Sequence, residues 1–124
     1  MTWGQEILRA FLLVLGCTEI ITNLTHLVKK GGLKNTRKQH GELPAGISDK
    51  NIKVKVVCML IVGTALFTTA LSSYILHSYT GKAILIASIL FSVYGIIEAL
   101  YYKYWKTFGF AGVTIALLLF SIIV

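Results

Sequence analysis

Two glutamates, Glu19 and Glu98, interrupt long apolar stretches, and their placement suggests chemistry more strongly than that of any other residue. Glu19 lies midway between Ala10 and Val28, near the centre of an apolar segment. An ionisable group at such a depth in a membrane costs about 2.5–3.5 kcal/mol on insertion scales, so it should face protein or water. A carboxylate held there can exchange a proton for a cation, which is the logic of coupled transport.

Glu19 belongs to a polar stripe on its segment. Glu19, Thr22, Asn23 and His26 follow the spacing i, i+3, i+4 and i+7, which places them on one face of a helix. From depth alone, the partners expected for Glu19 on other helices are Thr64, Thr68 and Ser92. The alternative is a purely structural Glu19 that is protonated and donates one hydrogen bond between helices.

Glu98 completes the set of candidate binding or transport residues. It lies shortly before Lys103, near one membrane surface, where it can pair with His26 or with a nearby lysine. A structural contact is the favoured interpretation for Glu98. We expect no bound metal or other cofactor, because His26 and His77 should lie at opposite sides of a hydrocarbon layer about 30 Å thick. No nucleophile–base pair, glycine-rich phosphate loop or Cys-x-x-Cys motif occurs, so the chain is not expected to be an enzyme.

The segments that must position these residues are long and apolar. Hydrophobic residues make up 56% of the chain and charged residues only 14%, against about 25% charged in soluble domains. A membrane-spanning helix needs about 20 mostly apolar residues. The segments that meet this requirement are 7–28, 54–76, 83–102 and 107–124. The sequence therefore predicts an all-α, polytopic membrane protein in which residues 1–124 form a single domain, a four-helix transmembrane bundle.

The basic residues predict the orientation of this bundle. Eight of the twelve Lys and Arg residues lie in or next to the loop of residues 29–53. Because Lys and Arg in short loops stay on the cytoplasmic side, this loop should be inside, with both termini outside, in the plasma membrane. The cations expected to bind anionic lipid headgroups are Lys29, Lys30, Lys34, Arg37 and Lys38. Nucleic acid is not expected as a partner, because the loop has no Phe, Tyr or Trp to stack on bases.

The sequence contains signals for the N-terminus of the second helix. Ser48 can cap its free N–H groups, and Asp49 favours the positive end of the helix dipole. A helix that begins there would extend Lys50, Lys53 and Lys55 into the headgroup layer.

Small residues predict which helix faces pack, because helices in lipid associate through close contact of Gly, Ala, Ser and Thr. Three segments carry such faces, and each face should meet another helix. The faces are Thr64, Thr68 and Ser72 beside Ala65, Thr69 and Ser73; Ser88, Ser92, Gly95 and Ala99; and Gly109, Gly112 and Ala116.

Two functional classes fit these patterns. The first is a small transporter or channel-type subunit with an intramembrane carboxylate site. The alternative is a non-catalytic accessory, assembly or immunity-type subunit of a larger membrane complex. Four short helices enclose little space for a solute path, so in either class we expect a homo-oligomer or a larger membrane-protein partner.

Overall fold

The computed structural model describes residues 1–28 and 46–124. Within these residues the chain forms four helices and no strand. The helices are α1 (Trp3–Val28), α3 (Asp49–Ile75), α4 (Gly81–Tyr102) and α5 (Trp105–Ile123). All four are long and apolar enough to cross a membrane. The predicted fold class, an all-α four-helix membrane bundle, is confirmed.

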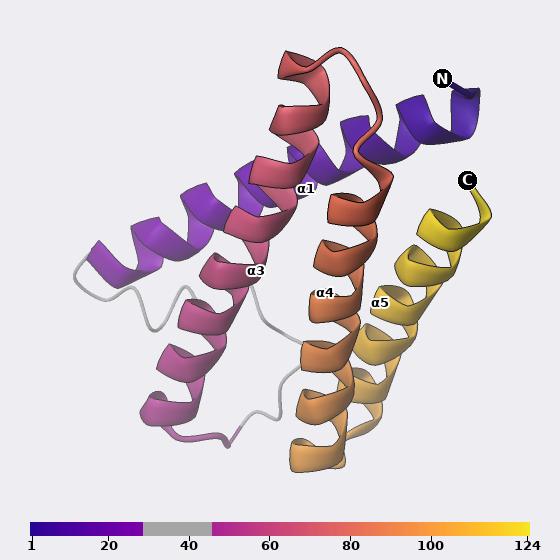
Figure 1. Ribbon diagram of the computed structural model, residues 1–124. Coiled ribbons are helices and arrows are strands. Elements are labelled where there is room, and N and C mark those ends of the chain that lie inside the picture. The colour runs from indigo at the N-terminus through magenta and orange to yellow at the C-terminus, as the bar shows by residue number, and fades with distance from the viewer. Residues whose placement is uncertain (29–45) are drawn as a thin grey trace.

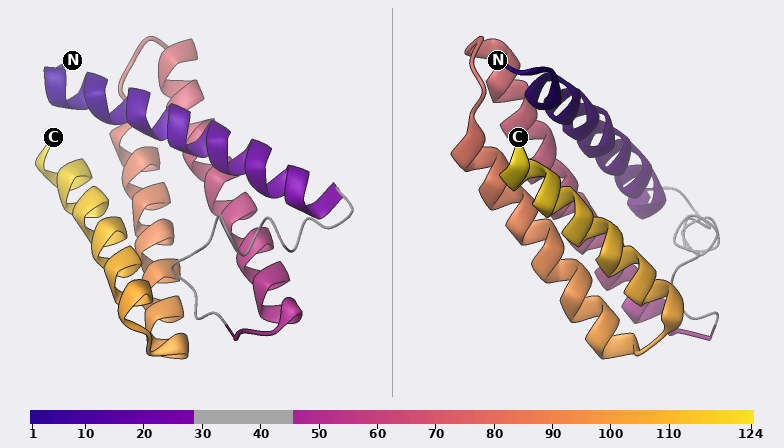
Figure 2. Two further views of the ribbon diagram at one scale, coloured as in Figure 1. Left: turned by 180° about the vertical axis from the view of Figure 1, so that it is seen from behind. Right: turned by 90° about the vertical axis from the view of Figure 1, so that its right-hand side faces the viewer.

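The helices form two closely packed pairs. α4 and α5 lie side by side, while α1 crosses α3 obliquely and its C-terminal half diverges from α4 and α5 (Figures 1 and 2). Both chain termini lie at one end of the bundle, where the Gln5 side-chain amide donates a hydrogen bond to the Val124 carbonyl at 3.0 Å. At the opposite end, α3 begins and α4 ends (Figure 1). We call this opposite end the base of the bundle.

The expected beginning of the second helix is present. Ser48 has an extended backbone, and its hydroxyl accepts a hydrogen bond from the Asn51 backbone N–H at 3.3 Å. Asp49 lies in the first turn, where its negative charge favours the helix dipole. The predicted cap is therefore confirmed.

Two glycines allow α1 and α3 to cross in close contact. A Cβ atom placed on Gly16 would lie 2.6 Å from the Phe67 backbone nitrogen, and one on Gly63 would lie 2.8 Å from the Glu19 Cβ. Side chains at either position would hold the two backbones apart. The crossing therefore depends on the small residues that promote helix association in lipid.

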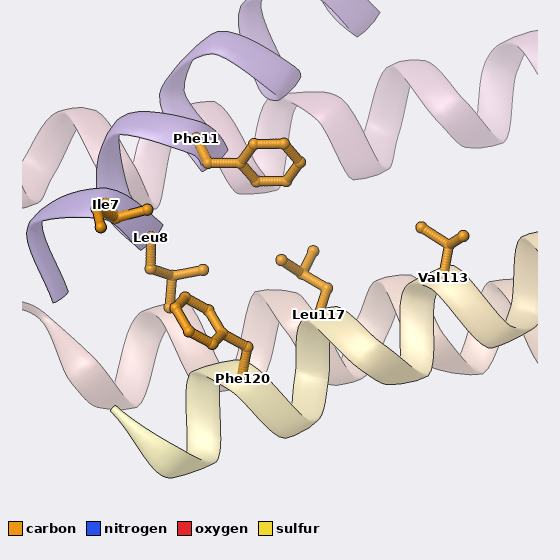
Figure 3. Close-up of a pocket in the computed structure, with 6 residues that line it drawn as sticks. All are labelled: Ile7, Leu8, Phe11, Val113, Leu117 and Phe120. Atoms are coloured by element: carbon orange, nitrogen blue, oxygen red, sulfur yellow. The ribbon is translucent and has the colours of Figure 1, made fainter. Parts of the chain in front are cut away.

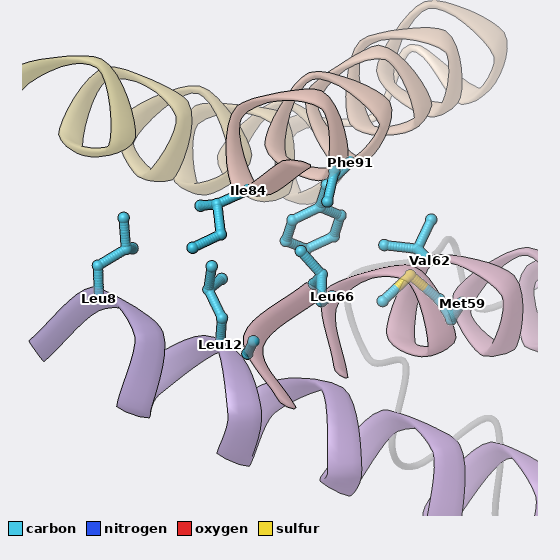
Figure 4. Close-up of a cluster of buried hydrophobic side chains, with 9 residues drawn as sticks. Leu8, Leu12, Met59, Val62, Leu66, Ile84 and Phe91 are labelled. Carbon is cyan, nitrogen blue, oxygen red and sulfur yellow. The ribbon is translucent and has the colours of Figure 1, made fainter. Parts of the chain in front are cut away.

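An apolar cluster joins α1, α3 and α4 beside this crossing (Figure 4). Its buried members are Leu8, Leu12, Met59, Val62, Leu66, Ala70, Ile84, Ala87 and Phe91. α5 joins the cluster through Phe110, whose ring meets Phe91 edge-on at a centroid distance of 5.7 Å. Because lipid tails are as apolar as these side chains, close dispersion contact contributes more here than removal from water.

The small-residue face of α4 packs as expected. Its residues Ser88, Ser92, Gly95 and Ala99 are all buried. Ser92 donates a hydrogen bond to the Thr114 carbonyl at 2.9 Å, and a Cβ on Gly95 would lie 2.7 Å from the Thr114 hydroxyl oxygen. This face is the contact surface for α5.

The other two small-residue faces were assigned wrongly in part. On α3, Thr64, Thr68 and Ser72 are exposed, and each hydroxyl donates to a carbonyl of its own helix at 2.7–2.8 Å. The neighbouring column of Ala65, Thr69 and Ser73 turns inward instead. On α5, the exposed residues are Gly109, Gly112 and Ala116, whereas Thr107, Ala111 and Thr114 are buried. Neighbouring columns lie about 100° apart around a helix, and composition alone did not select between them.

Arg9 connects α1 to the end of α3. One guanidinium nitrogen donates to both carboxylate oxygens of Glu6 at 3.2 Å. The other lies 3.3 Å from the Ser73 carbonyl oxygen, in the last turn of α3, and the guanidinium carbon is 4.1 Å from the centre of the Tyr74 ring. A cation is favourable there because the carbonyl end of a helix dipole is negative.

Replacing Arg9 should loosen this end of the bundle. Because the Arg9 side chain is only 11% exposed, we expect Arg9→Gln to lower the free energy of unfolding by about 1.5–3 kcal/mol, the range for hydrogen bonds to charged groups. Thermal unfolding in detergent, followed by circular dichroism, measures the change. Lys82→Gln is the control, since Lys82 is an exposed cation. Equal destabilisation by the two substitutions would contradict the proposed role of Arg9.

Candidate functional site

A buried ion pair lies at the base of the bundle, between α3 and α4. The Lys55 ammonium lies 2.7 Å from a Glu98 carboxylate oxygen, and the two side chains are 1% and 2% exposed. The expectation that Lys55 extends into the headgroup layer is wrong. Lys55 occupies the inward face of α3, where Ile52 and Met59 are also buried, and the attraction of Glu98 holds its charge inside.

Two aromatic rings also lie close to the Lys55 ammonium. The nitrogen lies 3.9 Å from the centre of the Phe110 ring on α5 and 5.1 Å from that of Tyr94 on α4. A cation over an aromatic face is attracted by the ring quadrupole, more strongly where water is excluded. We call Glu98, Tyr94 and Phe110 the ammonium cage. It brings together side chains from α4 and α5 around a cation supplied by α3.

A groove of about 490 Å³ borders the ammonium cage. Its lining is mostly apolar and aromatic and comprises Asn51, Val54, Lys55, Cys58, Tyr94, Ile97, Glu98, Tyr101 and Tyr102. Val54, Ile97 and Tyr101 are each more than half exposed, so the groove opens at the surface between α3 and α4. Its size falls in the range of small-molecule pockets, about 300–1,000 Å³.

The structure selects between the two partners expected for Glu98. Of His26 and a nearby lysine, the observed partner is a lysine, Lys55 of α3. Sequence reasoning missed Lys55 as a site residue because a lysine near the first turn of a spanning helix ordinarily reaches the membrane surface. The burial of Lys55 could have been predicted from its helical spacing, because Ile52 and Met59 lie on the same face of the helix and are apolar.

Glu19 lies at the crossing of α1 and α3, with its Cβ against Gly63. The Asn23 side-chain amide donates to the Glu19 carboxylate and to the Glu19 backbone carbonyl, both at 2.7 Å, and Asn23 is fully buried. The partners expected from depth are wrong: the hydroxyl groups of Thr64, Thr68 and Ser92 donate to backbone carbonyls. Glu19 meets its hydrogen-bond donor one turn along its own helix.

The remaining predicted site residues lie around this position. Thr22 is half-buried and its hydroxyl donates to the Thr18 carbonyl at 2.7 Å, while His26 is half-buried in the last turn of α1. Glu19 faces α3 at Gly63, roughly two turns or about 12 Å from Lys55 along that helix, so the two carboxylates occupy separate positions. The expected headgroup-binding residues lie outside the described residues. They are Lys29, Lys30, Lys34, Arg37 and Lys38.

A second cavity, of about 300 Å³, lies between α1 and α5. The side chains of Ile7, Leu8, Phe11, Val113, Leu117 and Phe120 project toward it, and all are apolar (Figure 3). It offers no side-chain donor or acceptor to orient a ligand. In residues 1–28 and 46–124, no group of three His, Cys, Asp or Glu residues lies close enough to hold a metal ion.

The fold and the site define a class of protein: a small integral membrane protein of four apolar helices, with an ion pair buried between two of them. Comparison with protein-family models, with curated proteins and with solved structures gives no significant match.

Proposed function

We propose that this chain is a small transporter or channel-type subunit whose principal working group is the Glu98 carboxylate at the base of the bundle. The observation that carries the proposal is the buried Lys55–Glu98 pair beside an open groove of about 490 Å³. Glu19, with Thr22, Asn23 and His26, forms a separate polar position on α1 that lies apart from this pair.

The energetics of ion pairs support a functional pair rather than a simple tie between helices. Removing two charges from water costs several kcal/mol per ion, and well-packed apolar residues often stabilise a fold as well as a buried pair or better. Ionisable residues within membrane spans are rare and mark ion and substrate pathways. The groove gives a solute a route to Glu98, which a structural tie does not need.

The proposed orientation follows from the charge distribution. With the loop of residues 29–53 on the cytoplasmic side and both termini outside, the base of the bundle faces the cytoplasm. Both termini at one end of the bundle support an arrangement in which they share one side of the membrane. In the plasma membrane, the groove would then exchange solutes with the cytoplasm or with the inner leaflet.

Substitution of Glu98 tests this function. In liposomes containing the purified protein and an internal pH-sensitive dye, external sodium, potassium, choline or benzyltrimethylammonium should drive proton release by the wild type. We expect Glu98→Gln to reduce this flux at least tenfold, because proton–cation exchange needs a carboxylate that binds the cation in one step and a proton in another, and the amide binds neither.

Glu19→Gln is the matched control, since it makes the same chemical change at the crossing of α1 and α3. We expect it to retain most of the flux. Unchanged flux in Glu98→Gln, or no flux above that of empty liposomes in the wild type, would refute the proposed function. Loss in Glu19→Gln alone would move the site to the polar stripe of α1.

A second candidate function, that of an accessory subunit, is favoured by the exposed face of α5. Gly109, Gly112 and Ala116 are exposed, and Cβ atoms placed on the two glycines would meet nothing within 4 Å. Small residues of this kind allow another helix to approach closely. Purification in mild detergent separates the candidates: a stoichiometric partner supports the accessory role, and recovery of only a homo-oligomer counts against it.

A further inference from the structure

The ammonium cage has the chemistry of a receptor for organic cations. A carboxylate oxygen lies 2.7 Å from the Lys55 nitrogen, and the rings of Phe110 and Tyr94 lie 3.9 and 5.1 Å from it. A negative charge combined with aromatic faces is the combination that recognises quaternary ammonium ligands. In this structure the cation within the cage belongs to the chain itself.

The groove beside the cage suits the apolar part of such a ligand. Tyr101, Tyr102, Ile97 and Val54 form much of its wall, and it opens at the surface between α3 and α4. A ligand with an aromatic or alkyl body and one cationic group can place its body in the groove and its charge near Glu98. The groove thus selects for hydrophobic cations over small hydrated ones.

The Lys55 ammonium can also reach the membrane surface. It lies within two turns of the beginning of α3, on the same stretch as the exposed Lys50 and Lys53. The flexible four-carbon stem of lysine allows its ammonium to reach a membrane surface from such a position. Departure of Lys55 from the cage as another cation enters leaves the charge of the site unchanged.

We propose that the ammonium cage and its groove bind hydrophobic organic ammonium ions. When no such ion is bound, the Lys55 ammonium occupies the cage, and an incoming ion must displace it. This inference rests on the proposed function, because it names the substrate class of the same Glu98 site. Lys55 keeps the site closed when no substrate is present. Substrate binding and outward movement of Lys55 are then one coupled exchange.

Binding of benzyltrimethylammonium to the purified protein in zwitterionic nanodiscs tests this proposal, by isothermal titration calorimetry. Removing the competing ammonium with Lys55→Met should tighten binding at least tenfold, and Glu98→Gln should abolish saturable binding. Lys53→Met, the same change at an exposed lysine of α3, should leave the affinity unchanged. Neopentylbenzene, the neutral isostere of the probe, should bind equally to wild type and Glu98→Gln.

A second measurement uses the wild type alone and so does not depend on the folding of Lys55→Met. Acetylation of Lys55 by acetic anhydride, quantified by mass spectrometry, should be slow and should accelerate several-fold when benzyltrimethylammonium is added. Acetylation of Lys53 should not change. The proposal is overturned if neither wild type nor Lys55→Met binds the probe, or if bound probe leaves the acetylation of Lys55 unchanged.

Failure of this proposal is distinguishable from failure of the proposed function. If Glu98→Gln abolishes cation-driven proton flux while the probe fails to bind, the transport site stands and only the substrate class is wrong. If Glu98→Gln leaves the flux intact, the transport function fails whatever the probe binds.

Discussion

Lys55→Met should be strongly destabilising, lowering the free energy of unfolding by about 3–5 kcal/mol, the range measured when one partner of a buried ion pair is removed. The substitution keeps the length of the side chain but removes the ammonium that lies 2.7 Å from Glu98. The Glu98 carboxylate would then remain 97% buried without this opposite charge. Denaturation in mixed micelles with increasing sodium dodecyl sulfate, followed by helicity, measures the loss.

The double variant Lys55→Met with Glu98→Gln separates the charge effect from a packing effect. Because it removes both charges of the pair, we expect it to recover most of the stability lost by Lys55→Met alone. Lys53→Met should change stability by less than about 0.5 kcal/mol, as is usual at exposed positions. Additive losses in the double variant would contradict a coupled pair.

Gly16→Ala should weaken the contact of α1 with α3, at a cost of about 1–3 kcal/mol, the range for overpacking. The added Cβ would lie 2.6 and 2.9 Å from the backbone nitrogen and Cα of Phe67. Backbone atoms cannot move aside as a side chain can, so the two helices must separate. The same denaturation experiment detects the change.

Gly112→Ala is the matched control for the crossing, because it is the same substitution within a helix but its Cβ meets nothing within 4 Å. Alanine favours helix over glycine, so this variant should be as stable as the wild type or slightly more stable. If Gly16→Ala behaved like Gly112→Ala, the close crossing of α1 and α3 would be refuted.

The membrane spans could be predicted because their signal is local. Length and apolar composition define each helix, and the Ser48 cap depends on a hydrogen bond to Asn51, three residues away. The packing faces depend on neighbours that composition does not specify. Both columns of small residues on α3 satisfy the same rule for close approach, yet only that of Ala65, Thr69 and Ser73 turns inward.

Of the two residues in the buried ion pair, only Glu98 could be predicted as a site residue from the sequence. Glu98 stands out because a carboxylate in an apolar segment demands a partner. Lys55 does not stand out, because a lysine near a helix end has an ordinary solution at the membrane surface. Lys55 is buried because it contacts Glu98 and Tyr94 on α4 and Phe110 on α5. The spacing of residues along the chain does not predict contacts between different helices.

The half-buried thiol of Cys58 lines the groove beside the ammonium cage, and Cys17, the other cysteine, belongs to α1. The molecule therefore carries its own attachment point for a spectroscopic label at the groove. In a Cys17→Ser background, a nitroxide or fluorophore on Cys58 would report occupancy and local motion there without an introduced cysteine. Such a label would measure binding at the groove over time.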